Sequence, residues 1–325
     1  IPKVTIAWYR NAGGNNADLP VMCHPIGGGR DTPTLHKADD LEGMEEMPFK
    51  ELFKAHSIVM CPTELSATAP MKVVAKAAGT GPDGLRAATM PGFTEAMVPA
   101  LRLDYGIINK RVNMLKDLIH VAEQADLVFT VEGTEHKLTL DLRHRPGHAS
   151  GGLFPNNGTA GNLPSGEAYI VPYEGEIAGD ASRSQGTMPV QIGDEVVVYR
   201  IEGNKAVEVL TDGPASQEEW RHIQAEPAYA NLAELGLGVL GDFGLKPTGS
   251  ILLDEKLGLH IAFGRSDHFT GGTVGPKDFS CPDAVIHLDR VYIPETQPKV
   301  HVNSCTLTGP SLDRVILRDN VFIGL

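Results

Sequence analysis

Hydrophobic residues follow two different periods along this chain. Up to about residue 130, short apolar runs such as KVTIAWY and SIVMCPT alternate with helical stretches such as PFKELFKAH and APMKVVAKAAG. A long helix is predicted over residues 102–125, and the strand DLVFTVEG follows it. Strands separated by helices are typical of a parallel sheet covered by helices. The sequence therefore predicts an α/β domain over residues 1–135, which we expect to be incomplete at its N-terminus.

The second half of the chain favours antiparallel β structure. The stretch EVVVYRIEGNKAVEVL consists of two alternating runs around residues 203–204, which predicts a β-hairpin. One helix is predicted to start at a capping box formed by Ser216 and Glu219, and a second short helix is predicted through NLAELG, ended by Gly236. We therefore predict a mainly antiparallel β domain over residues 136–325 and an α+β fold overall.

Two glycine-rich segments interrupt these patterns. Residues 145–167 are dense in Gly, Pro and Asn, and an irregular stretch of this length inside a compact domain is commonly functional. The stretch HPIGGGRD, residues 24–31, offers glycines to a phosphate group. It lacks the Lys-Ser/Thr of a P-loop and the spacing of a dinucleotide fingerprint, so phosphate binding is the minor alternative there.

Composition restricts the partners and the compartment. With 325 residues the chain has room for two domains, and its formal net charge of −13 without a Lys/Arg cluster argues against nucleic-acid and anionic-membrane surfaces. No apolar run approaches the roughly 20 residues that span a bilayer. The four cysteines are far apart and form no C-x-x-C pair, and the chain does not open with the layout of a signal peptide. We therefore expect a cytoplasmic enzyme for small or cationic substrates.

An imidazole and a carboxylate lie within the apolar strand AVIHLDRVYI. Side chains alternate along a strand, so His287 and Asp289 point to the same side, next to Val285 and Val291. An ionised carboxylate among valines is costly unless it is paired or bound to a metal. The pattern is compatible with an ordinary His–Asp hydrogen bond and with a two-residue metal ligand. Further ligands elsewhere in the chain would favour the metal.

Three more side chains in the same half can supply those ligands. Glu167 lies where the glycine-rich segment enters a strand, and His260 interrupts an apolar strand. Glu234 is flanked by apolar residues at a predicted helix end, where its charge opposes the helix dipole. An exposed glutamate and a satisfied core histidine remain alternatives for Glu167 and His260. Together with His287 and Asp289, these side chains form a nitrogen and oxygen set that suits two divalent ions sharing a carboxylate, with Zn²⁺, Mn²⁺, Co²⁺ and Fe²⁺ all open.

The motifs around these residues carry a family resemblance. NLPSGE, AELGLG, LLDEKLGLHIAFG and IHLD resemble, in order and spacing, the aminopeptidase T / aminopeptidase S / PepS family of dinuclear metallopeptidases. LRAATMPGFTEAMV and DYGIINKR extend the resemblance toward residue 55. The resemblance implies an α/β domain, a β-rich metal domain, a homodimer, and removal of N-terminal residues from peptides. It implies these metal ligands: Glu167, Glu234, His260, His287 and Asp289.

The sequence also departs from that family. Its members often place a tyrosine near the metals after the HxAxG strand, where this chain reads RSDHF, so we expect Asp267 or His268 to act there as a catalytic group. A branch related by fold, the 2,5-dihydroxypyridine dioxygenases, binds one Fe²⁺ and lacks the equivalents of Glu167 and His260. We therefore predict an aminopeptidase with two divalent ions, Zn, Co or Mn before Fe, and a small peptide or amide substrate. The alternatives are a mononuclear non-haem Fe(II) ring-cleaving dioxygenase and an amide hydrolase with a small non-peptide substrate.

Overall fold

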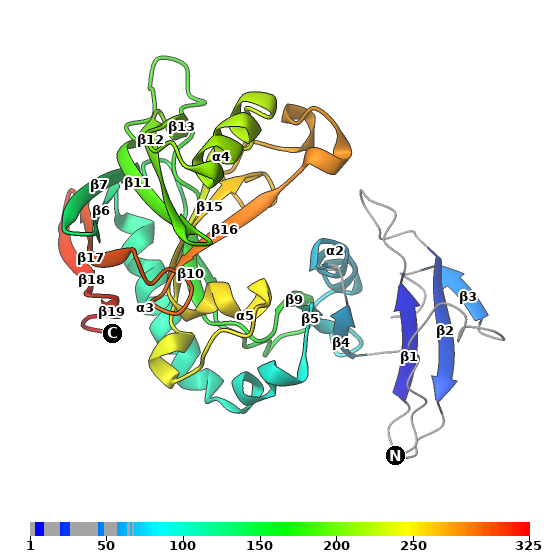
Figure 1. Cartoon of the computed structure of the whole chain (residues 1–325). Coiled ribbons are helices and arrows are strands. Elements are labelled where there is room, and N and C mark those ends of the chain that lie inside the picture. The colour runs from blue at the N-terminus through cyan, green and yellow to red at the C-terminus, as the bar shows by residue number, and fades with distance from the viewer. Residues whose placement is uncertain (1–3, 10–19, 27–44, 49–56, 64–65, 67) are drawn as a thin grey trace. The chain divides into compact units, whose positions relative to one another are not determined.

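The computed structural model describes residues 4–9, 20–26, 45–48, 57–63, 66 and 68–325 (Figure 1). The chain divides into two compact units, Ile1–Phe93 with Phe154–Leu163, and Thr94–Leu153 with Pro164–Leu325. This division differs from the predicted boundary after residue 135, which falls in the strand pair β6 (Gln124–Val131) and β7 (Thr134–Asp141) of the second unit. Residues 49–56 of the predicted helix PFKELFKAH and residues 27–31 of the glycine-rich stretch lie outside the described residues.

The first unit contains the parallel sheet that the alternation of strands and helices predicts. Its strands are β4 (Ile58–Thr63), β5 (Arg86–Pro91) and β9 (Thr159–Asn162), and helix α2 (Thr68–Ala78) packs against β5 and β9. A separate antiparallel sheet consists of β1 (Val4–Tyr9), β2 (Pro20–Ile26) and β3 (Glu45–Pro48). Strand β9 comes from the glycine-rich segment 145–167, so part of that segment completes the parallel sheet rather than forming a free loop.

The second unit is built mainly on antiparallel sheets, as predicted, which gives the α+β fold. Its larger sheet has the order β13-β12-β11-β7-β6-β17-β18-β19. The further strands are β11 (Gln185–Ile192), β12 (Glu195–Glu202), β13 (Lys205–Val209), β17 (His301–Gly309), β18 (Leu312–Arg318) and β19 (Val321–Phe322). The predicted hairpin joins β12 to β13 (Figure 1). Gly203 and Asn204 both have positive φ there, at 56° and 68°, as a tight two-residue hairpin turn requires.

Two long helices cover the sheets of this unit. Helix α3 (Tyr105–Val121) lies within the predicted range 102–125 and begins where the Asp104 carboxylate accepts a hydrogen bond from the Gly106 amide at 2.8 Å. Helix α4 (Pro214–Ala225) packs on β12 and β13. The predicted capping box of α4 is wrong, because the Glu195 carboxylate accepts the hydrogen bonds of the first helical amides instead. The short helices are Glu95–Arg102, Leu240–Phe243, α5 (Ile251–Asp254), η6 (Glu255–Leu257), Pro276–Asp278 and Pro282–Ala284.

A five-stranded antiparallel sheet carries the candidate site. Its order is β16 (His287–Tyr292), β15 (Leu259–Gly264), β14 (Leu232–Gly238), β10 (Glu167–Ile170) and β8 (His148–Ser150). Every residue of β14 and β15 is buried, and α3 packs against β10 and β8. The helix predicted through NLAELG is wrong, because these residues form the middle strand. Their backbone groups pair with β10 and β15, and tertiary pairing overrides the weak helix preference of Ala, Glu and Leu.

No helix in the described part of the chain is long and apolar enough to cross a bilayer.

Candidate metal centre

The five predicted ligands lie on one face of the five-stranded sheet. Asp289 and Glu234 both pair with Ala262, so these three residues form a row across β16, β15 and β14. His260 lies two positions from Ala262, and His287 lies two positions from Asp289, which keeps each on the same face. Glu167 pairs with Gly238, four positions from Glu234, and joins that face from β10. Strand register thus brings together residues that are far apart in the sequence.

Two glycines in β14 leave space for neighbouring groups, one for the His260 side chain and one for the backbone at Lys256. Gly236 pairs with His260, and a Cβ atom on Gly236 would lie 1.9 Å from His260 Nε2. A Cβ atom on Gly238 would lie 2.3 Å from the carbonyl carbon of Lys256. Gly236, which the sequence suggested as a helix terminator, is therefore the position that admits the imidazole of His260 into the sheet face.

The ligand atoms form two groups that share one carboxylate. The inner group comprises Glu167, Glu234 and His260, and the outer group comprises Glu234, His287 and Asp289; within each group the ligand atoms lie within 4.8 Å of one another. Glu234 directs one oxygen into each group, because Oε1 lies 3.6 Å from His260 Nε2 and Oε2 lies 3.1 Å from His287 Nε2. If each group held an ion, Glu234 would offer one oxygen to each.

Neighbouring carbonyl groups orient both imidazoles. His260 Nδ1 lies 3.2 Å from the Gly258 carbonyl oxygen, and His287 Nδ1 lies 2.7 Å from the Arg265 carbonyl oxygen. A proton on Nδ1 that is donated to a carbonyl leaves Nε2 as the coordinating atom, which is the usual support for a metal-binding histidine. Both Nε2 atoms face the carboxylates, so the two histidines are prepared for the same role.

Several buried polar atoms of the cluster lack a hydrogen-bond partner. Among the described residues these are Glu167 Oε2, His260 Nε2 and Asp289 Oδ1. Unpartnered polar atoms are rare in protein interiors because each costs free energy. All three belong to predicted ligands: Glu167 Oε2 lies 3.6 Å from His260 Nε2 in the inner group, and Asp289 Oδ1 lies 3.5 Å from His287 Nε2 in the outer group. A divalent cation with nitrogen and oxygen ligands fits these atoms.

The charges of the cluster shift the pKa values of its members. Burial alone would raise the pKa of Glu234, but a hydrogen bond with His287 and the nearby positive charges of His260 and His287 lower it to about 2. Burial alone would lower the pKa of His260, but Glu234 and the other nearby carboxylates raise it to about 9. Asp289 and Glu234 likewise raise the pKa of His287 well above its usual value against the effect of burial. Protons therefore compete with any cation for these ligands.

Sequence reasoning missed a buried lysine beside the cluster. The side chain of Lys256 is 2% exposed, its Nζ lies 2.5 Å from Glu167 Oε1, and it also forms an ion pair with Glu255. Burial, with further contributions from Asp289 and Glu167, raises the pKa of Glu255 to about 8 despite the opposing charge of Lys256. The signal was present in the sequence, since the charged triplet DEK is enclosed by the apolar stretches ILL and LGLHIAFG.

The two predicted catalytic residues differ in their position. The ring of His268 lies edge-on to the ring of His287, with centroids 4.8 Å apart, so it is next to the outer group. Asp267 is exposed and forms an ion pair with Arg265. Phe269 fills the space between His287 and Tyr169, at centroid distances of 5.5 Å and 4.7 Å. Of the two predicted groups, His268 is the one that contacts a candidate ligand.

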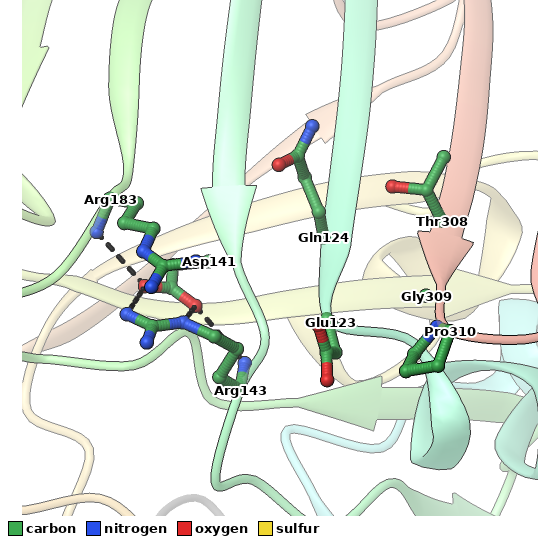
Figure 2. A pocket seen from close by; sticks show the side chains of 8 residues that line it. All are labelled: Glu123, Gln124, Asp141, Arg143, Arg183, Thr308, Gly309 and Pro310. Carbon is green, nitrogen blue, oxygen red and sulfur yellow. Dashed lines mark hydrogen bonds and ion pairs between the residues drawn. The ribbon is translucent and has the colours of Figure 1, made fainter.

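Figure 2 shows a different pocket of the second unit, to which none of the five candidate ligands contributes. Its lining residues are Glu123, Gln124, Asp141, Arg143, Arg183, Thr308, Gly309 and Pro310. Arg143 donates to Asp141 at 2.7 Å and to Asp180 at 2.9 Å, and the Arg183 amide donates to Asp141 at 2.9 Å. Asp141 and Arg143 form an ion pair. Together with the bonds to residues 180 and 183, this pair fixes the end of β7 to the segment that contains those residues.

Comparisons with known proteins identify the fold. No protein-family model and no curated protein sequence matches the chain. The 2,5-dihydroxypyridine dioxygenase from Pseudomonas putida KT2440 is similar in structure, with a TM-score of 0.59 and 14% identity over 85% of this chain and 74% of that chain. Wild-type AmpT from Thermus thermophilus has a TM-score of 0.47 and 18% identity over 71% of this chain and 58% of that chain. The chain thus shares its fold with a known enzyme.

Proposed function

We propose that the protein is a metal-dependent aminopeptidase, or a close amide hydrolase, with two divalent ions at the inner and outer groups. The observation that carries this proposal is the pair of ligand groups joined by Glu234. The unpartnered buried atoms of Glu167, His260 and Asp289 support it, because an ion in the inner group would satisfy the first two and an ion in the outer group the third. The ligand set of nitrogen and oxygen atoms suits Zn²⁺, Co²⁺, Mn²⁺ and Fe²⁺, and the proposed hydrolysis favours the first three.

Different residues of the chain would hold the ions, transfer a proton and bind the substrate at such a site. Divalent ions polarise a carbonyl group and lower the pKa of a water molecule toward neutrality. Glu234 would bridge the two ions, while His260 and the pair of His287 and Asp289 would each hold one. His268 lies next to His287 and is our candidate for proton transfer at the outer group. Asp267, exposed nearby, is our candidate for binding the free amino group of a small peptide.

A mononuclear iron enzyme that cleaves aromatic rings is the second candidate. The pairing of Lys256 with Glu167 at 2.5 Å favours it, because this pairing reduces the ligand strength of the inner group. Two histidines and one carboxylate with open positions are the usual ligands of non-haem Fe(II) oxygenases. Here the outer group would hold the single iron with one histidine, His287, and two carboxylates, Glu234 and Asp289.

Metal analysis of protein purified without added metal distinguishes these functions. We expect two ions of Zn, Co or Mn per chain, with chelator-sensitive hydrolysis of dipeptides or of aminoacyl p-nitroanilides. Re-addition of Zn²⁺, Co²⁺ or Mn²⁺ should restore the activity. One iron per chain, together with oxygen consumption on 2,5-dihydroxypyridine and no amide hydrolysis, would contradict the proposal and support the second candidate.

A further inference from the structure

A lysine ammonium group lies against the inner ligand group. Lys256 Nζ contacts Glu167 Oε1 at 2.5 Å and also pairs with Glu255, while its side chain is 2% exposed. Glu167 therefore has one oxygen bound to the ammonium, and its other oxygen, Oε2, faces His260 Nε2. The lysine already provides part of the positive charge that a metal ion would provide at this carboxylate.

The outer group has different neighbours. Glu234 Oε2 and Asp289 Oδ1 both face His287 Nε2, at 3.1 Å and 3.5 Å. In the described part of the chain, no lysine or arginine forms an ion pair with Glu234 or Asp289, whose ion-pair partners are imidazoles. A cation entering the inner group must instead share Glu167 with the ammonium of Lys256, which cannot coordinate while it carries three protons.

Resting on the proposed dinuclear site, we infer that Lys256 makes the two metal positions unequal. The outer group binds the first ion tightly, and the inner group binds the second ion more weakly. Coulomb repulsion between the buried ammonium and an ion at Glu167 Oε2 is strong because little solvent separates them. The same ammonium stabilises the metal-free cluster, in which three ligand carboxylates lie close together. Lys256 is therefore a positioning residue that sets the order of metal loading.

Titration of the metal-free full-length protein with Co²⁺ tests this inference. Calorimetry and visible absorption should resolve two binding steps in the wild type, with dissociation constants at least tenfold apart. Lys256→Met removes the repulsive charge, so the second step should tighten at least tenfold while the first step stays within threefold. Glu255→Gln removes the carboxylate on the other side of the ammonium. Lys256 then interacts with Glu167 alone, and the second step should weaken.

A control variant, and the opposite changes in the second binding step expected for Lys256→Met and Glu255→Gln, distinguish the possible results. Lys246→Met removes an exposed lysine that pairs with Glu295, and it should leave both steps unchanged. Two equal steps in the wild type, or a weaker second step in Lys256→Met, would overturn the inference and leave the dinuclear site intact. Failure of the wild type to bind Co²⁺ would overturn the proposed function and this inference together. If Lys256→Met does not fold, a second step in Glu255→Gln that is unchanged or tighter overturns the inference.

Discussion

The inner and outer ligand groups use the same kinds of side chains in different surroundings. All three inner residues are buried, and the lysine pairs with one of them. In the outer group the side chain of His287 is 19% exposed and lies against His268. The outer group is therefore the side that a solvent molecule or a substrate can approach, and the inner group is the closed side. Neighbouring residues, rather than the identity of the ligands, therefore distinguish the two positions in this cluster.

The largest expected effect comes from the residue that both groups share. Glu234→Gln should abolish binding of both ions and lower activity by about two or more orders of magnitude. It should also destabilise the metal-free protein, because Glu234 accepts a hydrogen bond from His287 and its pKa is lowered to about 2. Metal content and melting curves with and without chelator measure both effects. Glu202→Gln, at an exposed position, is the control. A Glu234→Gln variant that retains two ions would contradict the shared-ligand assignment.

Most of the candidate ligands stand out in the sequence because they interrupt an apolar pattern, and Glu167 stands out where the glycine-rich segment enters a strand. Strand alternation put His287 on the same side as Asp289, and the register that joins Glu234 and Asp289 through Ala262 agrees with that. The surroundings of Glu234 were not predictable in the same way. Sequence favoured a helix end there, where the helix dipole opposes the charge, but the structure has a central strand beside two histidines. Pairing with β10 and β15 is a tertiary interaction that local propensity does not contain.

In the fold, too, the elements that depend on neighbouring residues were predictable, and those that depend on contacts between distant residues were not. Helix α3 and the hairpin of β12 and β13 follow from local patterns, and both were predicted. The segment 145–167 was expected to be a loop, but its residues add β8 to the five-stranded sheet and β9 to the parallel sheet. Lys256 was missed because a lysine is usually exposed, and only its partners Glu167 and Glu255 explain its burial.

The second prediction separates the two groups by stability. Glu167→Gln leaves the buried Lys256 ammonium with Glu255 as its remaining carboxylate, which should cost about 1.5–3 kcal/mol in the metal-free protein. Asp289→Asn should cost less, because His287 can release its proton when its partner is neutral. Each variant should lose one ion. Denaturant unfolding of the metal-free proteins and metal analysis of the loaded ones measure the difference. Equal unfolding costs would show that Lys256 does not distinguish the groups.

The third prediction concerns pH and the inner histidine. The pKa of His260 is raised from 6.5 to about 9, so its stabilising effect is complete below about pH 6.5 and is lost as pH rises through about 9. The metal-free protein should therefore lose stability over this interval. Metal affinity at the inner group should rise by up to about tenfold per pH unit over the same interval, because binding displaces a proton. Calorimetry in two buffers with different ionisation enthalpies counts the released protons. An affinity independent of pH between 6.5 and 9 would contradict this prediction.

The smallest effects are expected at the two predicted catalytic residues, of which His268 contacts the outer group and Asp267 pairs with Arg265. His268→Phe preserves a ring against His287 but removes the proton-transfer group, so turnover should fall by about tenfold or more while the metal content stays unchanged. Asp267→Asn should raise KM by only about threefold, because Arg265 already pairs with the Asp267 carboxylate and would compete with a substrate amine for it. Steady-state kinetics with peptides that carry a free or an acetylated N-terminus separate the two roles. Loss of an ion in His268→Phe would instead make His268 a ligand, and the outer group would then extend beyond the sheet.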